Sequence, residues 1–119
     1  MKQEDKQLIL KDLCARLPYN VKCYIEFNDG KILLGRTLMP IMIQDFKSHE
    51  CLVIKPYLRP RSSMTEEEKV KYHSYCDNYY DIYFDTIESI DYLNSIHVDY
   101  RGLIPMGLAL EAPKDMYKL

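Results

Sequence analysis

The chain has no tryptophan and only four glycines, and its four cysteines include no Cys-x-x-Cys pair. Glycines this isolated exclude a phosphate-binding loop, which needs a glycine-rich run. Scattered cysteines in a chain without a recognisable signal peptide indicate reduced thiols and a cytoplasmic location. The sequence therefore gives no reason to expect a disulfide framework or a bound cofactor.

The chain also lacks an excess of charge and a long apolar run. Its 16 basic residues stand against 18 acidic ones, so no overall positive field attracts nucleic acid or membrane. The longest apolar stretch, around residues 32–43, is interrupted by Gly35, Arg36 and Pro40. It falls short of the roughly 18 apolar residues of a membrane helix, and we expect a soluble protein.

A hydrophobic content of 47% over 119 residues is enough for a single core. We therefore expect residues 1–119 to form one domain, with 114–119 as a loose tail. The first predicted element is a helix over residues 4–17, in which apolar side chains recur at helical spacing. Asp12 and Arg16 are assigned to its solvent side, and Pro18 ends it.

Residues 21–27 alternate between apolar and polar side chains, as a half-buried strand does. Asp29-Gly30 is typical of a type I′ turn, so residues 31–39 are expected to return as the antiparallel partner of that strand. We assign residues 41–43 to a short, bent continuation. Residues 51–55 are continuously apolar enough to form a central strand.

The stretch after this strand combines prolines with a strong helix start. Residues 56–60 are interpreted as a rigid connector, because both prolines lack an amide hydrogen. Ser63 with Glu66, or Thr65 with Glu68, then fits the capping box of a helix that continues to about residue 76.

The last third of the chain holds weaker signals. Residues 81–84 are aromatic and favour a fourth strand, and Asp85 with Glu88 is predicted to cap a further helix. Asp99 is expected to cap one or two helical turns that end at Gly107. The sequence thus predicts an α+β fold, in which a small antiparallel sheet built on a β-hairpin packs against an N-terminal helix and two or three further helices.

Neither metal binding nor catalysis has a convincing pattern. His73 and Cys76 lie three residues apart on a predicted helix, but a structural zinc site needs about four ligands and no second ligand pair exists. No Gly-x-Ser-x-Gly motif is present, and the cysteines lie in apolar patterns where a thiol is inert. We assign no catalytic residue and no metal ligand, and we expect a protein that is not an enzyme.

Two groups of residues favour binding. Lys55, Arg59 and Arg61, with Tyr57 among them, form the best candidate for an anion or nucleic-acid contact, although the neighbouring residues 66–68 are all glutamate. The chain also contains 11 tyrosines. Several crowd one region that includes Tyr79, Tyr80 and Tyr83, where they form either a recognition surface or the edge of a small core.

These residues favour a small non-enzymatic binding or regulatory protein that acts through protein–protein contacts. Its partner is an unidentified protein or a second copy of the chain. The alternative is a nucleic-acid or nucleotide binder that uses Lys55, Arg59 and Arg61.

Two stretches of the chain resemble a family of small uncharacterised proteins from gut Bacteroidales and their phages or prophages. They are KPYLRPRSSMTEEE, residues 55–68, and DYLNSIHVDYRGLIPMGLALEAPKDMYK, residues 91–118. KQLILKDLCARLPYNVK, residues 6–22, extends the resemblance over most of the chain. Many members have Trp-Leu-Asn in place of Tyr92-Leu93-Asn94 and an aromatic residue in place of Val98, which are changes typical of a packing site. The resemblance implies a cytoplasmic protein of mobile-element type, with a role in phage–host interaction or regulation.

Overall fold

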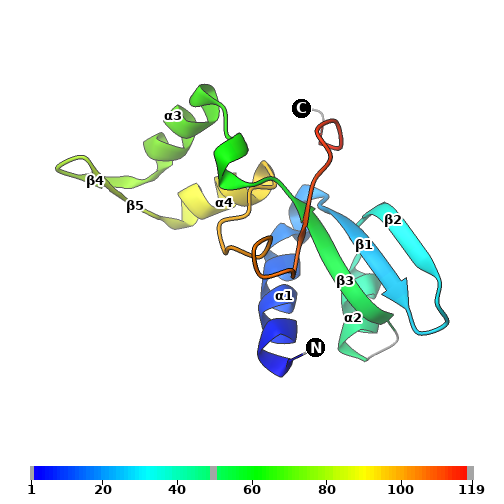
Figure 1. The fold of residues 1–119 in the computed structure, drawn as a ribbon. Coiled ribbons are helices and arrows are strands. Elements are labelled where there is room, and N and C mark those ends of the chain that lie inside the picture. Colours follow the sequence, from blue (N-terminus) through cyan, green and yellow to red (C-terminus); the bar gives the residue numbers. More distant parts are fainter. Residues whose placement is uncertain (1, 49–50, 118–119) are drawn as a thin grey trace.

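The protein has an α+β fold, and the computed structural model describes residues 2–48 and 51–117, without the side chains of residues 51 and 52. A helix-covered sheet forms the body, and an arm of two helices and a short hairpin projects from it (Figure 1). The molecule measures 53 × 30 × 24 Å along its principal axes. None of the helices in the described residues is long and apolar enough to cross a membrane.

The sheet of the body has four strands in the order β2-β1-β3-β6. They are β2 (Ile32–Thr37), β1 (Lys22–Phe27), β3 (Cys51–Leu58) and β6 (Leu110–Glu111). The predicted hairpin and the central third strand are confirmed. β6 runs parallel to β3, whereas the other pairs are antiparallel, so the sheet is mixed rather than antiparallel throughout.

The β1–β2 turn differs from the predicted type. The Gly30 amide donates to the Phe27 carbonyl at 3.0 Å, and Gly30 has a φ of 87°. Asp29 does not have a positive φ, whereas a type I′ turn with Asp29 and Gly30 at its centre requires this of both residues. The turn instead ends in a left-handed glycine, a conformation that glycine adopts without steric cost.

Two helices, α1 (Gln3–Arg16) and α2 (Pro40–Lys47), lie on one face of the sheet (Figure 1). The prediction that residues 41–43 continue the sheet is wrong, because they form the first turns of α2. Pro40 occupies the start of this helix, where a missing amide hydrogen costs nothing. Ile43 and Phe46, three residues apart, turn into the core.

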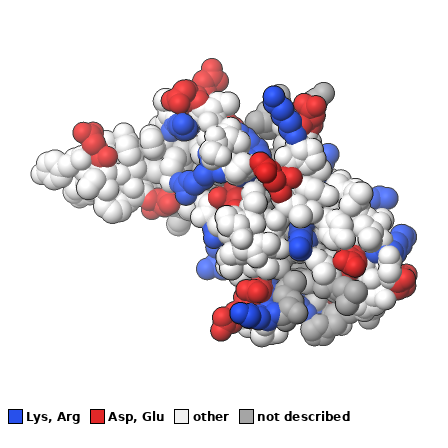
Figure 2. Space-filling view, viewed as in Figure 1, with Lys and Arg blue, Asp and Glu red and all other residues white. Residues whose placement is uncertain are grey.

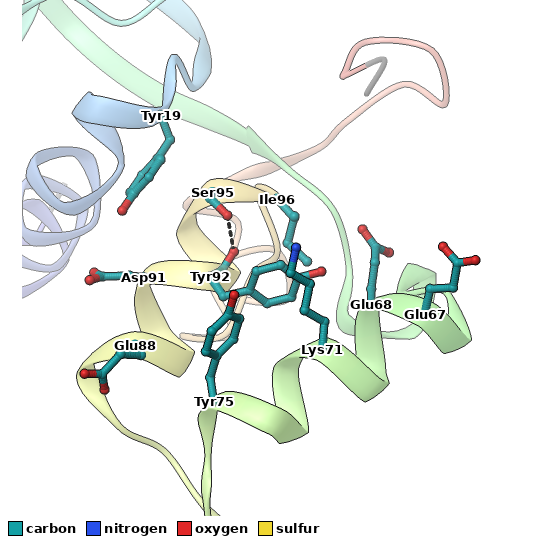
Figure 3. Close-up of a pocket in the computed structure, with 10 residues that line it drawn as sticks. All are labelled: Tyr19, Glu67, Glu68, Lys71, Tyr75, Glu88, Asp91, Tyr92, Ser95 and Ile96. Atoms are coloured by element: carbon teal, nitrogen blue, oxygen red, sulfur yellow. Dashed lines mark hydrogen bonds between the residues drawn. The ribbon is translucent and has the colours of Figure 1, made fainter.

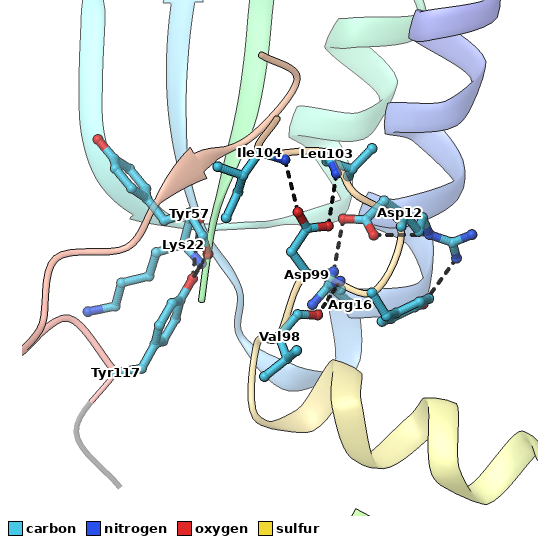
Figure 4. Close-up of polar contacts among 11 residues, drawn as sticks. Asp12, Arg16, Lys22, Tyr57, Val98, Asp99, Leu103, Ile104 and Tyr117 are labelled. Atoms are coloured by element: carbon cyan, nitrogen blue, oxygen red, sulfur yellow. Dashed lines mark hydrogen bonds and ion pairs between the residues drawn. The ribbon is translucent and has the colours of Figure 1, made fainter. Parts of the chain in front are cut away.

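The prediction that Asp12 and Arg16 face solvent is also wrong, since both residues are 0% exposed. Their side chains pair at 2.9 Å, and the Arg101 guanidinium donates to the other Asp12 oxygen at 3.1 Å (Figure 4). Arg16 also donates to the Val98 carbonyl. One carboxylate therefore holds two arginines and ties α1 to the segment that follows the arm, as a buried charge requires.

The proline-containing stretch is a strand for most of its length. β3 extends through Leu58, and Arg59 forms a further parallel bridge with Val98. The connector predicted for residues 56–60 is therefore wrong except at its end. β6 pairs with β3 only from Tyr57 onwards, directly after Pro56, which is consistent with a residue that has no amide hydrogen to donate.

The arm contains α3 (Glu66–Tyr75) and α4 (Ile87–Ser95). α3 begins at the predicted Thr65–Glu68 capping box. The prediction that Asp85 and Glu88 cap α4 is wrong: Thr86 and Ser89 form its capping box instead. The Asp85 carboxylate accepts hydrogen bonds from the hydroxyls of Ser89 and Tyr72.

The C-terminal segment folds back over the body. The Asp99 carboxylate accepts from the amides of Leu103 and Ile104 at 2.9 Å each, and it stabilises a series of turns rather than a helix. The Tyr117 hydroxyl donates to the Tyr57 carbonyl at 2.7 Å and accepts from the Lys22 amide at 2.8 Å (Figure 4). Residues 114–117 are therefore not a loose tail, and residues 118–119 lie outside the described part of the chain.

Buried apolar side chains gather in two clusters. The larger one lies between α1, α2 and the sheet, and its most enclosed members include Ile9, Leu13, Val21, Cys23, Ile25 and Ile54. The smaller one joins α4 to the start of the arm and consists of Met64, Leu93, Ile96 and Val98, with partly buried tyrosines against them. The arm therefore has its own small core.

Candidate interaction surface

A two-stranded hairpin at the end of the arm exposes most of its side chains. β4 (Asp77–Tyr79) and β5 (Ile82–Phe84) pair antiparallel, and every residue of both strands is exposed. Tyr80, at the tip, is 96% exposed. In the space-filling view the projection carries a few acidic groups and no basic patch at its end (Figure 2). Its exposed large side chains are Tyr79, Tyr80, Ile82, Tyr83 and Phe84.

The pairing places three apolar side chains, with the carboxylate of Asp77 at the base, on one face of the hairpin. Residues directly opposite each other share a face, and the register pairs Tyr79 with Ile82 and Asp77 with Phe84. Tyr79 is 67% exposed and Ile82 58%. We call Tyr79, Ile82 and Phe84, with Tyr80 at the tip, the hairpin surface. Exposed apolar side chains that gather in this way mark interaction sites more often than scattered ones do.

The opposite face of the hairpin is fixed to the arm. Tyr83 lies there, and its ring stacks on that of His73 with centroids 4.0 Å apart and planes 9° from parallel. At the base, the Thr86 hydroxyl donates to the Tyr75 carbonyl at 2.6 Å. The hairpin surface is thereby held in one orientation relative to α3 and α4, which lowers the entropic cost of binding a partner.

The turn of the hairpin contains a tyrosine in an unfavourable conformation. Tyr80 and Asp81 have φ values of 51° and 64°, which is the type I′ pattern normally occupied by Asn-Gly. For an amino acid other than glycine, the left-handed region costs about 1–2 kcal/mol. A fully exposed ring is therefore kept where a small residue would fit better, which marks Tyr80 as a candidate for the proposed role below.

Arg59, the centre of the predicted cation cluster, is committed to the fold. Its guanidinium makes a bidentate pair with Glu68 at 2.7 and 2.8 Å and donates to the carbonyls of Ser63 and Ile96. The hydrogen bonds from Arg59 lower the pKa of Glu68 to about 2. Glu68 therefore neutralises the positive charge of Arg59, and the hydrogen bonds of Arg59 join the end of β3 to α3 and α4.

The other members of the predicted cluster point to different surroundings. Lys55 and Tyr57 are half-buried on the outer face of the sheet, since the alternate residues of β3 fill the core. Arg61 lies against Tyr72, with its guanidinium 5.6 Å from the ring centroid. Of the residues predicted for binding, the structure brings Tyr79, Tyr80 and Tyr83 together on one element. It does not present Lys55, Arg59 and Arg61 as three free cations.

A groove in the arm was not predicted from the sequence. It has a volume of about 730 Å³ and lies between α3, α4 and the short helix Leu17–Tyr19 (Figure 3). Tyr19, Tyr75 and Tyr92 supply aromatic walls, and acidic residues lie on both long helices. The large number of tyrosines is the sequence feature that could have indicated this groove, but which tyrosines come together depends on how α4 packs.

The described thiols and imidazoles give no sign of a metal centre. Among the side chains of residues 2–48 and 53–117, no three of His, Cys, Asp or Glu are placed to share an ion. Burial, followed by the charge of Asp12, raises the pKa of the Cys23 thiol to about 12, so that thiol is inert. The prediction of an apolar setting is wrong for Cys14, which is exposed on α1. The thiol of Cys51 lies outside the described side chains.

No protein-family model, no curated protein and no solved structure matches the chain.

Proposed function

We propose that the protein is a non-enzymatic binding module whose hairpin surface docks on a protein partner. The observation that carries this proposal is the exposed apolar face of β4–β5, which is held rigidly by contacts on the opposite face. Tyrosine is suited to such a role because it offers a large contact area with few torsions and a polar tip. A cytoplasmic setting and a regulatory role in a phage or prophage remain part of the proposal.

The rival function, nucleic-acid binding through Lys55, Arg59 and Arg61, has less support. A phosphate backbone is held by cations that are free to release counterions, whereas the Arg59 guanidinium is already paired with Glu68. A salt-dependent affinity for oligonucleotides that is lost in Lys55→Gln/Arg61→Gln would favour this rival.

The proposed function is tested with two double variants, each of which replaces two exposed apolar side chains by threonine. Tyr79→Thr/Ile82→Thr strips the hairpin surface, and the β-branched threonines preserve strand propensity. Ile32→Thr/Leu34→Thr is the control, because these two residues are also exposed on one face of a strand, the edge strand β2. Wild type and both variants serve as baits in host lysate, and bound proteins are quantified by mass spectrometry.

We expect a partner that binds wild type and the β2 control but is depleted at least about tenfold on the hairpin variant, as loss of an apolar hot spot predicts. Self-association is followed in parallel by analytical ultracentrifugation, because a second copy is also an eligible partner. Equal binding of every interactor to all three baits, together with no change in self-association, would refute the proposal.

A further inference from the structure

The groove of the arm has the chemistry of a cation site. Tyr75 and Tyr92 contribute neighbouring rings whose centroids are 5.5 Å apart. Tyr19 reaches the same space from the body, and its hydroxyl points toward α4 (Figure 3). Aromatic faces carry negative electrostatic potential and attract ammonium and guanidinium groups within about 6 Å. Three rings around one groove thus provide walls suited to a positively charged group.

A cation already lies at this wall. The Lys71 ammonium is 5.7 Å from the centroid of the Tyr92 ring, and the close-up shows it beside that ring at the α3 side of the groove (Figure 3). No described carboxylate lies within ion-pair distance of it. The position over the ring is therefore one that the fold offers to a positive charge, and Lys71 occupies it.

The groove has more carboxylates than Lys71 can balance. Glu67, Glu88 and Asp91 line it, and none of the three side chains forms an ion pair or hydrogen bond with another described residue. Glu68 also lines the groove, but its charge is matched by Arg59. The excess negative charge beside the rings is complementary to a cation supplied from outside.

We propose that this groove receives an arginine or lysine side chain from a basic segment of the protein partner. The inference rests on the proposed function and adds the chemistry of the partner to it. The cationic head takes the position of Lys71 over Tyr92, beside Tyr75. The carboxylates of Glu88 and Asp91 extend from α4 on the Tyr19 side of the groove and attract the head through their unbalanced charge (Figure 3). A metal ion is a poorer occupant, because the described carboxylates do not converge as ligands.

The groove is tested directly with a short peptide, so no natural partner is required. Acetyl-Gly-Arg-Gly-Arg-Gly-amide is titrated into the full chain, and the tyrosine ring signals are followed by NMR. We expect saturable shifts of the Tyr75 and Tyr92 signals. Replacing both arginines by citrulline keeps the shape and removes the charge, and this peptide is expected to leave the signals in place.

Three variants separate groove binding from general attraction. Glu88→Gln/Asp91→Asn should weaken peptide binding about fivefold, which is the combined effect of two exposed ion pairs. Asp45→Asn/Asp115→Asn makes the same change of net charge outside the groove and should leave binding within twofold of wild type. Lys71→Met removes the internal competitor and should strengthen binding, a gain that no purely structural role of Lys71 predicts.

Equal affinity for the citrulline peptide, or an equal loss in the two charge variants, would overturn the inference. Its failure is distinguishable from failure of the proposed function. If a partner no longer binds Tyr79→Thr/Ile82→Thr but still binds Glu88→Gln/Asp91→Asn, the hairpin surface is the docking site and the groove is not part of it.

Discussion

At the scale of single residues, several charged side chains form ion pairs that stabilise the fold. Asp12 holds Arg16 and Arg101, and Arg59 is held by Glu68. Asp12 and Arg16 form a fully buried pair, and removing one partner of such a pair leaves an uncompensated charge, which typically costs about 3–5 kcal/mol. These arginines are therefore structural, and the proposed cation site relies on the unpaired carboxylates of the arm.

His97 should make stability depend on pH in a defined window. It is 6% exposed, stacks on Tyr117 at 3.7 Å, and its Nδ1 has no described hydrogen-bond partner. Burial, followed by the charges of Arg16, Arg59 and Lys22, lowers its pKa to about 4. The unfolded chain therefore binds a proton first, so stability is complete above about pH 6.5 and falls as the pH drops toward 4.

His97→Asn should abolish this dependence. Asparagine tolerates the left-handed conformation of residue 97, where φ is 64°. Between pH 7 and 4, the free energy of unfolding of wild type should fall by about 2–3 kcal/mol more than that of the variant. Urea unfolding at each pH measures both, and parallel curves for the two proteins would contradict the assignment.

Part of the residue-scale picture was predictable. The Thr65–Glu68 cap follows from local sequence, because both partners lie within one helical turn. The burial of Asp12 and Arg16 was not predictable in this way. Their role depends on Arg101, which is 89 residues from Asp12, and only the packed chain brings it near.

At the scale of elements, the β4–β5 hairpin is where the local sequence preference and the structure disagree. Its strands are only three residues each, and its turn holds Tyr80 at a positive φ. The strand prediction for residues 41–43 was wrong for a different reason: a short apolar run fits a helix and a strand equally well. The Asp29-Gly30 hairpin was predictable because its flanking strands alternate cleanly.

Tyr80→Asn should stabilise the hairpin while weakening recognition. Asparagine adopts the left-handed conformation at lower cost, so the hairpin should gain about 0.5–1 kcal/mol. Amide hydrogen exchange in residues 77–84 measures the gain, with Tyr79→Asn, at an extended position, as the control that gains nothing. A faster exchange in Tyr80→Asn than in wild type would show that the ring itself supports the turn.

At the scale of the molecule, the larger core supports the body and the smaller core supports the arm, with the hairpin outside both. An α+β fold with an N-terminal helix was predictable from periodicity. It was not predictable that residues 82–84 would pair outside the main sheet. Their strand partner is β4, and the sequence of β4 resembles a fraying helix end.

This arrangement predicts that the hairpin can be removed without unfolding the protein. Asp77 and Phe84 face each other across the ladder, so a Gly-Gly linker between residues 76 and 85 closes the gap. No residue of either strand is buried, and the excision should therefore change the free energy of unfolding by less than about 1 kcal/mol. Leu93→Ala, which truncates a side chain in the core of the arm, should cost about 2–5 kcal/mol instead.

Urea denaturation followed by circular dichroism measures both changes, and NMR spectra show whether the amides of residues 3–48 keep their positions. A large loss of stability on excision would mean that the aromatic hairpin belongs to the fold rather than to a binding surface. If the shortened protein stays folded, still binds the arginine peptide and no longer captures the partner, then folding, cation recognition and docking reside in three separable parts of one chain.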